Sequence, residues 1–309
     1  MNYKAGELIK YLRKEKKMSQ EKLSEGIMSR VHLSRIEKDE NTPTMDVVIF
    51  LLERLEVSPE RLFPYSLDEN DFKLFALRDK LEHCLAASDY GKAAELLAMI
   101  EKAFGPHPNN IRKQYILMNK AILVRRLEKD SKKALKLLEE AIGITVKDYN
   151  EKHIRSYLLA SQEITILNNI AAIHCEHGEV DRAVCMLERM AEKIRRYSID
   201  ERQKARMLTY VLLSLSNALG AQKRYDEANN ICDEAIDAGR ENRVSELLPN
   251  LMYNKAYALH CLGHPEDEVK HLLYQAYYGS IEKGRVINAA QIRDKALHNF
   301  GIEVDKTKD

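Results

Sequence analysis

The sequence contains few of the residues that interrupt helices: its 309 residues include only 12 glycines and 7 prolines. It also lacks β-branched segments in which apolar and polar residues alternate, the pattern typical of half-buried strands. Together these two absences favour a chain that is helical almost throughout.

Other absences concern the environment of the protein. No apolar run reaches the roughly 18 residues that a membrane-spanning helix needs. The N-terminal stretch MNYKAGELIKYLRKEKK lacks the apolar centre of a signal peptide. Five cysteines, an odd number without a compact framework spacing, favour a reducing compartment. We therefore expect a cytoplasmic protein that does not interact with membranes.

Sequence motifs of catalysis are also missing. The chain has no HExxH motif, no glycine-rich phosphate loop and no nucleophile elbow, so we expect neither an enzyme nor a cofactor. His-Cys dipeptides recur at 83–84, 174–175 and 260–261, which leaves a metal or redox site as an alternative. However, neighbouring residues on a helix point about 100° apart and do not converge on one ion. Small buried cysteines are the preferred interpretation, and we expect no metal site.

Charge is distributed unevenly along the chain. The formal net charge is only +1, yet the first 38 residues contain ten Lys or Arg against five Glu, a local excess of five positive charges. The remainder is correspondingly negative. Binding to nucleic acid, if present, therefore has to depend on the N-terminal part.

The stretch 19–37, SQEKLSEGIMSRVHLSRIE, predicts two short helices joined by a tight turn. Ser19 and Ser29 can each accept hydrogen bonds from the exposed N–H groups of a following helix. Gly26 permits a turn that would strain a residue with a Cβ atom. On the second helix, Leu33 and Ile36 are three residues apart and face inward. This is a helix-turn-helix, whose second helix can present side chains to a DNA major groove.

The flanking segments complete a small all-helical domain. Residues 4–14 have the apolar spacing of a helix, and residues 45–55 are strongly apolar after a break at Asn41–Thr44. A last turn is expected from Ser58 to Phe63. Five helices in about 65 residues can close on one core.

Residues 6–63 resemble an Xre/Cro-type DNA-binding domain, on Gln20 and Leu23, the sequence LSRIE at 33–37, and Pro43 before the fourth helix. The turn between the two helices is one residue shorter than in phage repressors. In this it is similar to the Rgg/PlcR-like peptide-responsive regulators of Gram-positive bacteria. The resemblance implies a structural ion pair between Arg13 and Glu37.

We expect the outward residues of this motif to contact DNA. Base edges would be read by Arg30, Val31, His32 and Arg35, whereas Ser19, Gln20 and Lys38 would lie nearer the phosphates. Ser29 is a further DNA-binding candidate. One such domain reads few base pairs. A homodimer on near-palindromic double-stranded DNA would place the second reader about 34–36 Å away on the same face.

Beyond residue 71 the sequence repeats. A turn followed by a small-residue signature occurs five times, with equivalent positions at Ala93, Ala134, Ala183, Ala228 and Val269. Intervals of 41, 49, 45 and 41 residues exceed the tetratricopeptide period of about 34, but the form is similar. We predict an α-solenoid of about five tetratricopeptide-like helix pairs, with residues 286–299 as a terminal helix.

The predicted domains are a helix-turn-helix domain at 1–65, a linker at 66–71 and a repeat domain at 72–309. This layout resembles that of the Rgg/PlcR-like regulators, whose repeats bind a short linear signalling peptide. The resemblance implies a transcription regulator whose DNA binding depends on such a peptide. The alternative is a DNA-tethered scaffold whose repeats bind a protein partner.

Candidate peptide-binding residues come from polar positions on the first helices of the repeats. In the helix beginning near 161, Gln162, Thr165 and Asn169 form a polar stripe between two apolar flanks. Amide side chains both donate and accept, so they can hold the backbone of an extended peptide. Arg112 could bind a carboxylate, and tyrosines could form apolar walls. The remaining candidates are Asn119, Tyr210, Asn217, Asn250, Asn254 and Tyr257. Each could equally be bonded within the helices.

Overall fold

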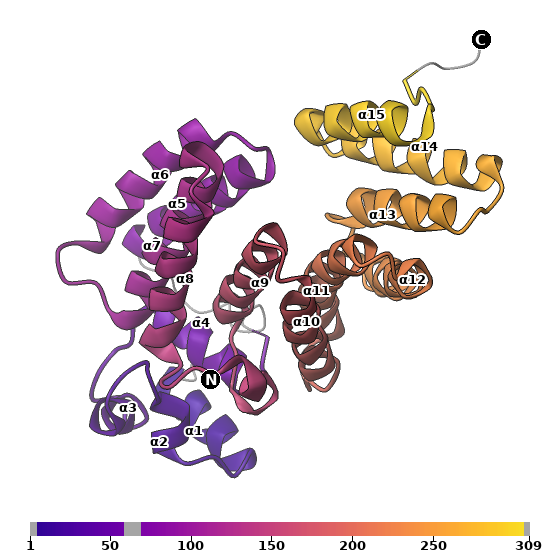
Figure 1. Cartoon of the computed structure of the whole chain (residues 1–309). Helices are drawn as coiled ribbons and strands as arrows, with labels where there is room; N and C mark the ends of the chain where they lie inside the picture. Colours follow the sequence, from indigo (N-terminus) through magenta and orange to yellow (C-terminus); the bar gives the residue numbers. More distant parts are fainter. Residues whose placement is uncertain (1–4, 59–68, 306–309) are drawn as a thin grey trace. The chain divides into compact units, whose positions relative to one another are not determined.

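The computed structural model describes residues 5–58 and 69–305, and within these ranges the regular structure is entirely helical (Figure 1). The N-terminal part contains α1 (Ala5–Glu15), α2 (Gln20–Ser24), α3 (Arg30–Ile36) and α4 (Met45–Arg54). The fifth helix expected in this domain falls within 59–68, outside the described residues. None of the helices in the described ranges has the length and apolar character needed to cross a lipid bilayer.

The predicted helix starts and the turn are confirmed. Ser19 Oγ accepts from Lys22 N at 3.1 Å, and Ser29 Oγ accepts from His32 N at 3.2 Å. Gly26 has φ +73°, and a Cβ atom there would lie 2.1 Å from the carbonyl oxygen of Thr145. The glycine therefore serves a turn and also a close backbone approach to the repeats.

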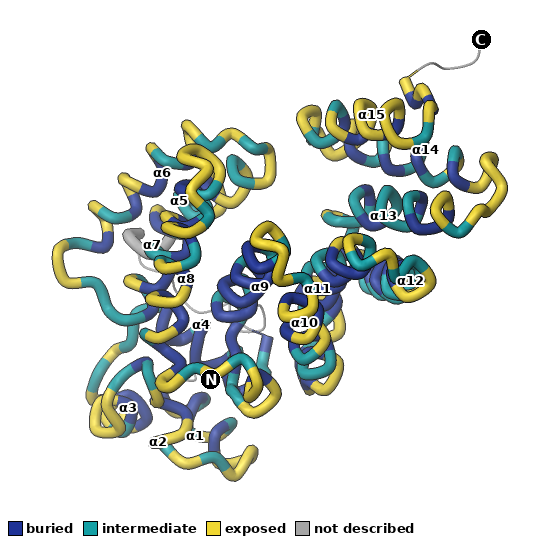
Figure 2. Tube along the Cα trace, in the orientation of Figure 1, coloured by how far each residue is buried: buried dark blue, intermediate teal, exposed yellow. Residues whose placement is uncertain are grey.

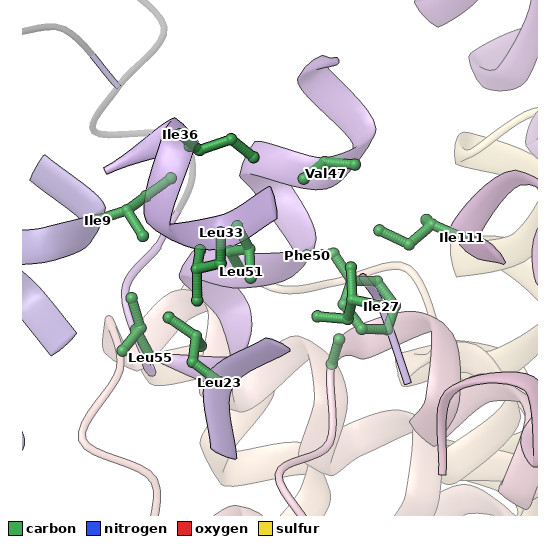
Figure 3. Close-up of a cluster of buried hydrophobic side chains, with 11 residues drawn as sticks. Ile9, Leu23, Ile27, Leu33, Ile36, Val47, Phe50, Leu51, Leu55 and Ile111 are labelled. Atoms are coloured by element: carbon green, nitrogen blue, oxygen red, sulfur yellow. The ribbon is translucent and has the colours of Figure 1, made fainter. Parts of the chain in front are cut away.

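The core of the helix-turn-helix extends into the repeats (Figure 3). Leu23, Leu33 and Ile36 are fully buried and are joined by residues of α1 and α4. Ile111 and Ala160, which belong to the repeats, are part of the same cluster. Apolar burial stabilises by about 25 cal/mol per Å², so this shared cluster holds the helix-turn-helix against the repeats as well as closing it.

The repeat part consists of consecutive helix pairs, as predicted. The pairs are α5 (Glu69–Ala86) with α6 (Tyr90–Phe104), α7 (Asn110–Leu123) with α8 (Ser131–Thr145), α9 (Ser161–Glu176) with α10 (Val180–Arg195), α11 (Glu201–Ala221) with α12 (Tyr225–Glu241), and α13 (Leu248–Cys261) with α14 (Glu266–Glu282). A terminal helix, α15 (Val286–Phe300), follows. The signature residues Ala93, Ala134, Ala183, Ala228 and Val269 are all buried on the second helices. Small side chains there permit close helix packing, which explains their recurrence.

The chain forms two compact units. The first contains residues 1–85, 89–170 and 197–200, and the second contains 86–88, 171–196 and 201–309. The first unit thus combines the helix-turn-helix with the first repeats, because α4 packs directly on α7. Helix α5 begins at Glu69, inside the stretch predicted as a linker. The predicted domain limits otherwise remain a prediction.

Candidate functional site

The outward face of α3 is accessible, as the prediction of a DNA-reading helix requires (Figure 2). Leu33 and Ile36 are fully buried, whereas Val31 is 56% exposed. Among the other predicted contacts, all but one are exposed, the exception being the half-buried Gln20: Ser19, Ser29, Arg30, His32, Arg35 and Lys38. Their accessibility permits DNA contact, and their roles remain predictions.

A buried ion pair fixes α3 against α1. Arg13 Nε and Nη2 donate to the two carboxylate oxygens of Glu37 at 2.6 and 2.7 Å, which confirms the expected pair. Gln20 Nε2 donates to the same carboxylate at 2.8 Å. Burial acts to raise the pKa of Glu37, but the hydrogen bonds from Arg13 and Gln20 outweigh it and hold that pKa below its usual value. Gln20 is therefore a structural brace in addition to a predicted phosphate contact.

On α3, Arg30 has only a surface partner. Its Nε lies 3.2 Å from Glu21 Oε1, and the two side chains are 60% and 64% exposed. Exposed pairs of this kind contribute about 0–1 kcal/mol. Arg30 can therefore exchange this carboxylate for a base edge or a phosphate at little cost.

Helix α4 is joined to the repeats by charged contacts that the sequence analysis did not foresee. Asp46, 5% exposed, accepts from Arg78 of α5 and, at 2.7 Å, from Arg112 Nε of α7. Arg112 was predicted to bind a peptide carboxylate, but here the carboxylate of Asp46 occupies its guanidinium. The signal that could have found this contact is an acidic residue in the otherwise apolar run 45–55.

A second buried cluster lies at the other end of α4. Arg54 Nη2 donates to Glu163 Oε1 at 3.0 Å and to the carbonyl oxygen of Thr145 at 3.1 Å. Thr145 Oγ1 also donates to Glu163 Oε1 at 2.6 Å. Nearby, Glu53 accepts from Ser161 Oγ at 2.7 Å, while burial raises the pKa of Glu53 above its ordinary value. The contacts of Glu53 and Arg54 bridge more than 90 residues of sequence and fix the helix-turn-helix on α8 and α9.

Several predicted peptide contacts in α7 and α9 are occupied by bonds within the repeats. Asn119 is 2% exposed and donates to the carbonyl oxygen of Tyr115 at 2.9 Å. Gln162 donates to Gln114 Oε1 at 2.7 Å. Thr165 and Asn169 each bond to the carbonyl four residues earlier. The stripe is less buried than its apolar flanks, as predicted, but its donors are engaged locally.

The second unit contains a cavity of about 290 Å³. Three of the predicted residues line it, namely Asn217 on α11, and Asn254 and Tyr257 on α13. Tyr210 and Asn250 are not among its lining residues, and Asn250 instead donates to Asn288 Oδ1 at 3.2 Å. Tyr253, one of the tyrosines expected to form an apolar wall, also lines it. The sequence analysis missed the lining residues Ser216, Gly220, Ala221, Tyr225, Ala228, Ala258, Lys295 and Asn299.

Within the cavity the amides connect neighbouring helices. Asn254 Nδ2 donates to Ser216 Oγ at 2.8 Å and to Asn217 Oδ1 at 2.9 Å. On the side of α15, Asn299 Nδ2 donates to the Tyr253 hydroxyl at 2.9 Å, and Lys295 Nζ lies 5.6 Å from the centre of the Tyr253 ring. The cavity thus combines amides, aromatic faces and a cation, a set that suits a peptide segment.

The tyrosines of this cavity are neutral at physiological pH. A hydrogen bond with Cys261 raises the pKa of Tyr225, an electrostatic interaction with the same side chain raises the pKa of Tyr257, and burial raises the pKa of Tyr253. Since the ordinary pKa of tyrosine is about 10, all three hydroxyls remain protonated and can donate hydrogen bonds.

The cysteines of the His-Cys dipeptides differ from the preferred interpretation. Cys84 and Cys175 are half-buried and Cys261 is exposed, so their assignment as buried core cysteines is wrong. The described parts of the chain hold no cluster of three or more His, Cys, Asp or Glu side chains placed to bind a metal ion.

Comparison with known protein families identifies both parts of the chain. A helix-turn-helix family matches residues 9–62, and a tetratricopeptide repeat family matches residues 209–241. A further match, to anaphase-promoting complex subunit 5, covers residues 80–165. Comparison with curated proteins gave no match.

Solved structures resemble nearly the whole chain. PlcR of Bacillus thuringiensis, in complex with the peptide PapR7 and DNA, is 18% identical with a TM-score of 0.64, over 94% of this chain and 98% of that one. ComR of S. thermophilus, in complex with DNA and its signalling peptide ComS, is 15% identical with a TM-score of 0.57, over 96% and 100% of the two chains. ComR from Streptococcus vestibularis, with its signalling peptide XIP, is 12% identical with a TM-score of 0.57, over 95% and 97%. The chain is therefore an all-helical protein with an N-terminal helix-turn-helix and tetratricopeptide-like repeats, sharing the fold of PlcR and ComR.

Proposed function

We propose that this protein is a sequence-specific, DNA-binding transcription regulator controlled by a short signalling peptide bound in its repeats. The observation that carries the proposal is the combination, in one chain, of an accessible, braced recognition helix and a cavity lined by amides and tyrosines. The neighbours PlcR and ComR, described in complexes with DNA and signalling peptides, support it at the level of the fold. A regulator of this kind acts in the cytoplasm, where bacterial DNA lies.

A scaffold that binds a protein partner is the second reading of the same fold. Protein partners usually bury about 800 Å² of each surface, which requires a broad face. The cavity is instead small, at about 290 Å³, and is partly polar. Such a site suits a few residues of a linear peptide, so the peptide reading is preferred.

In the proposed complex, α3 lies in the major groove. Arg30 and Arg35 are the residues best suited to guanine, since an Arg can bond bidentately to its O6 and N7 atoms. Val31 presents an apolar side chain that can contact a thymine methyl group, and His32, the next residue, is also exposed. Lys38 is positioned for phosphate. A homodimer on a near-palindromic operator would extend the short sequence read by one domain.

Control of DNA binding requires that the peptide favour one of two states of the protein. We propose that the contacts of Asp46 and Arg54 with the repeats make the helix-turn-helix follow any movement of α7 and α8. A typical coupling of about 1–3 kcal/mol would change operator affinity between roughly 5- and 150-fold.

The first test selects operators from random double-stranded DNA with the full-length protein. We expect one near-palindromic sequence to be enriched. The Arg35→Ala variant should lose discrimination at one base pair of each half-site, by about 1–3 kcal/mol. Lys38→Ala should weaken all sequences to a similar degree. The assignment of α3 would be contradicted if the wild type enriched no sequence. It would also be contradicted if Arg35→Ala and Arg30→Ala both kept the base preferences of the wild type.

The second test measures operator affinity before and after incubation with peptides retained by the protein from a random heptapeptide mixture. A change in affinity of at least fivefold is expected. Retention of peptides without any change in DNA affinity would favour the scaffold reading.

A further inference from the structure

The cavity of the second unit is too small for a whole signalling peptide. Sites that enclose most of a drug-sized ligand occupy about 300–1,000 Å³, and this cavity, at about 290 Å³, lies at the lower end. It can therefore enclose one end or one or two side chains of a peptide, while the rest of the ligand lies outside it. The chemistry of this cavity then decides which part of the peptide is bound there.

Charge in the cavity has one sign. Lys295 is the one charged residue among its described lining residues, which include no Asp or Glu. The ammonium group lies 5.6 Å from the centre of the Tyr253 ring, a distance typical of a cation–π contact. This contact holds the Lys295 side chain over the cavity without neutralising its charge, as a carboxylate partner would.

Other cationic side chains of the second unit contrast with Lys295. Lys255 is paired with Asp233, Lys270 with Glu266 and Arg224 with Glu227. Their charges are balanced by carboxylates of the protein itself. Among the described residues Lys295 has no carboxylate partner, so a carboxylate of a ligand can pair with it.

The surrounding groups favour an apolar side chain next to that carboxylate. Rings of Tyr225, Tyr257, Tyr253 and Phe300 form a chain of edge-to-face contacts with centroid separations of 6.1–6.2 Å. Three of these rings line the cavity, and Phe300 supports two of them. A ligand residue enclosed here would pack on aromatic carbon, while the tyrosine hydroxyls can donate hydrogen bonds to it.

We propose that Lys295 is the anion anchor of the peptide site and selects a peptide in which a carboxylate lies beside an apolar residue. This inference rests on the proposed function, and it identifies the part of the peptide that binds next to α15. The carboxylate is either the peptide's C-terminus or an Asp or Glu side chain. The amide donors of Asn254 and Asn217 are engaged with Ser216, Asn217 and Leu213, so Asn254 Oδ1 is the atom that would accept from the peptide backbone as it leaves the cavity.

The test uses three random heptapeptide mixtures and the immobilised full-length protein. One mixture lacks Asp and Glu and has a free C-terminus, the second lacks them and is amidated, and the third contains them and is amidated. We expect the wild type to retain the first or the third about fivefold better than the second, which is the upper end for an ion pair at an exposed cation. Retention of the first identifies a C-terminal carboxylate, and retention of the third identifies an acidic side chain.

Variants of Lys295 test the anchor itself. In Lys295→Gln the retention of the preferred mixture should fall to that of the acid-free amidated mixture. Lys295→Arg should keep the preference of the wild type. Lys270 lies on α14 outside the cavity, with a side chain that is 39% exposed. Lys270→Gln is the matched control and should behave as the wild type. The thermal midpoint of each variant verifies its folding.

The anchor and the proposed function fail in different ways. Equal retention of the three mixtures by the wild type, or an unchanged preference in Lys295→Gln, would overturn the anchor and leave the peptide function intact. Failure of the wild type to retain any mixture above a column without protein would overturn both.

Discussion

Charged side chains have different surroundings in two regions of the molecule. One region is the contact between α4 and the repeats, and the other is the cavity of the second unit. At α4 the charges are buried and paired with each other: Arg54 and Glu163 have side-chain exposures of 3% and 0%. In the cavity, Lys295 is exposed and its ammonium group lies 5.6 Å from the centre of the Tyr253 ring. Buried pairs fix a geometry, because an unpaired buried charge is costly, whereas an exposed cation can receive a ligand. The difference separates the contacts that position the helix-turn-helix from the cavity that is proposed to bind the peptide.

The largest expected effect comes from breaking the buried cluster. Arg54→Met leaves the carboxylate of Glu163 buried without its cation and should lower the free energy of unfolding by about 3–5 kcal/mol. Urea unfolding followed by circular dichroism measures it. Adding Glu163→Gln removes that charge and keeps an acceptor for Thr145, so the double variant should be more stable than Arg54→Met alone.

The matched control for Arg54→Met is Lys22→Met, which removes an exposed cation from the same domain and should change stability by no more than about 0.5 kcal/mol. If Arg54→Met were equally harmless, the α4 contact would not fix the helix-turn-helix on the repeats.

The Arg13–Glu37 pair predicts a smaller, pH-dependent effect. The pKa of Glu37 is lowered in the folded state, so its contribution is fully present above the unfolded pKa of about 4.3 and is lost as the pH falls through the folded value. Glu37→Gln should cost about 2 kcal/mol at pH 7. The difference in urea midpoint between this variant and the wild type should shrink below about pH 4.

Glu40→Gln, at an exposed position of the same domain, controls for general charge effects and should match the wild type at both pH values. A Glu37→Gln difference that stayed constant between pH 7 and pH 3 would show that ionisation of Glu37 is not the cause.

A substitution in the cavity should affect the stability of the protein less than it affects peptide binding. Asn254→Ala removes donors to Ser216 and Asn217 and should lower the free energy of unfolding by about 1 kcal/mol. Peptide retention should fall more strongly, to a tenth or less of the wild-type amount. Asn242→Ala, which removes an amide bonded to Ala238 outside the cavity, should leave retention unchanged. Equal losses of retention in the two variants would remove Asn254 from the site.

The smallest effect is expected at an exposed ion pair. Arg195 donates twice to Glu234, at 2.7 and 2.8 Å, with side chains 41% and 35% exposed. Arg195→Ala should change the free energy of unfolding by about 0–1 kcal/mol in spite of this good geometry. A loss of 3 kcal/mol or more would mean that burial is not what distinguishes the Arg54 cluster.

The sequence by itself determined the local structure. Serine caps, a glycine turn and apolar spacing of three and four residues depend on neighbours within one or two helical turns, so α2, α3 and the repeat helices were predictable. The pairing of Arg13 with Glu37 followed from resemblance to a family. The inward direction of Leu33 and Ile36 was equally predictable, because it depends on the helical period alone.

Only the tertiary structure decided which polar residues are occupied and which remain accessible. Arg112 and Lys295 are both cations on helices, and the sequence suggested the first as a carboxylate ligand and passed over the second. Folding brings Asp46, 66 residues earlier, onto Arg112, while it places Lys295 over the ring of Tyr253. Such partners are set by packing between distant segments, which no local pattern encodes. For the same reason, a turn at Gly26 could be predicted, whereas its close approach to Thr145 could not.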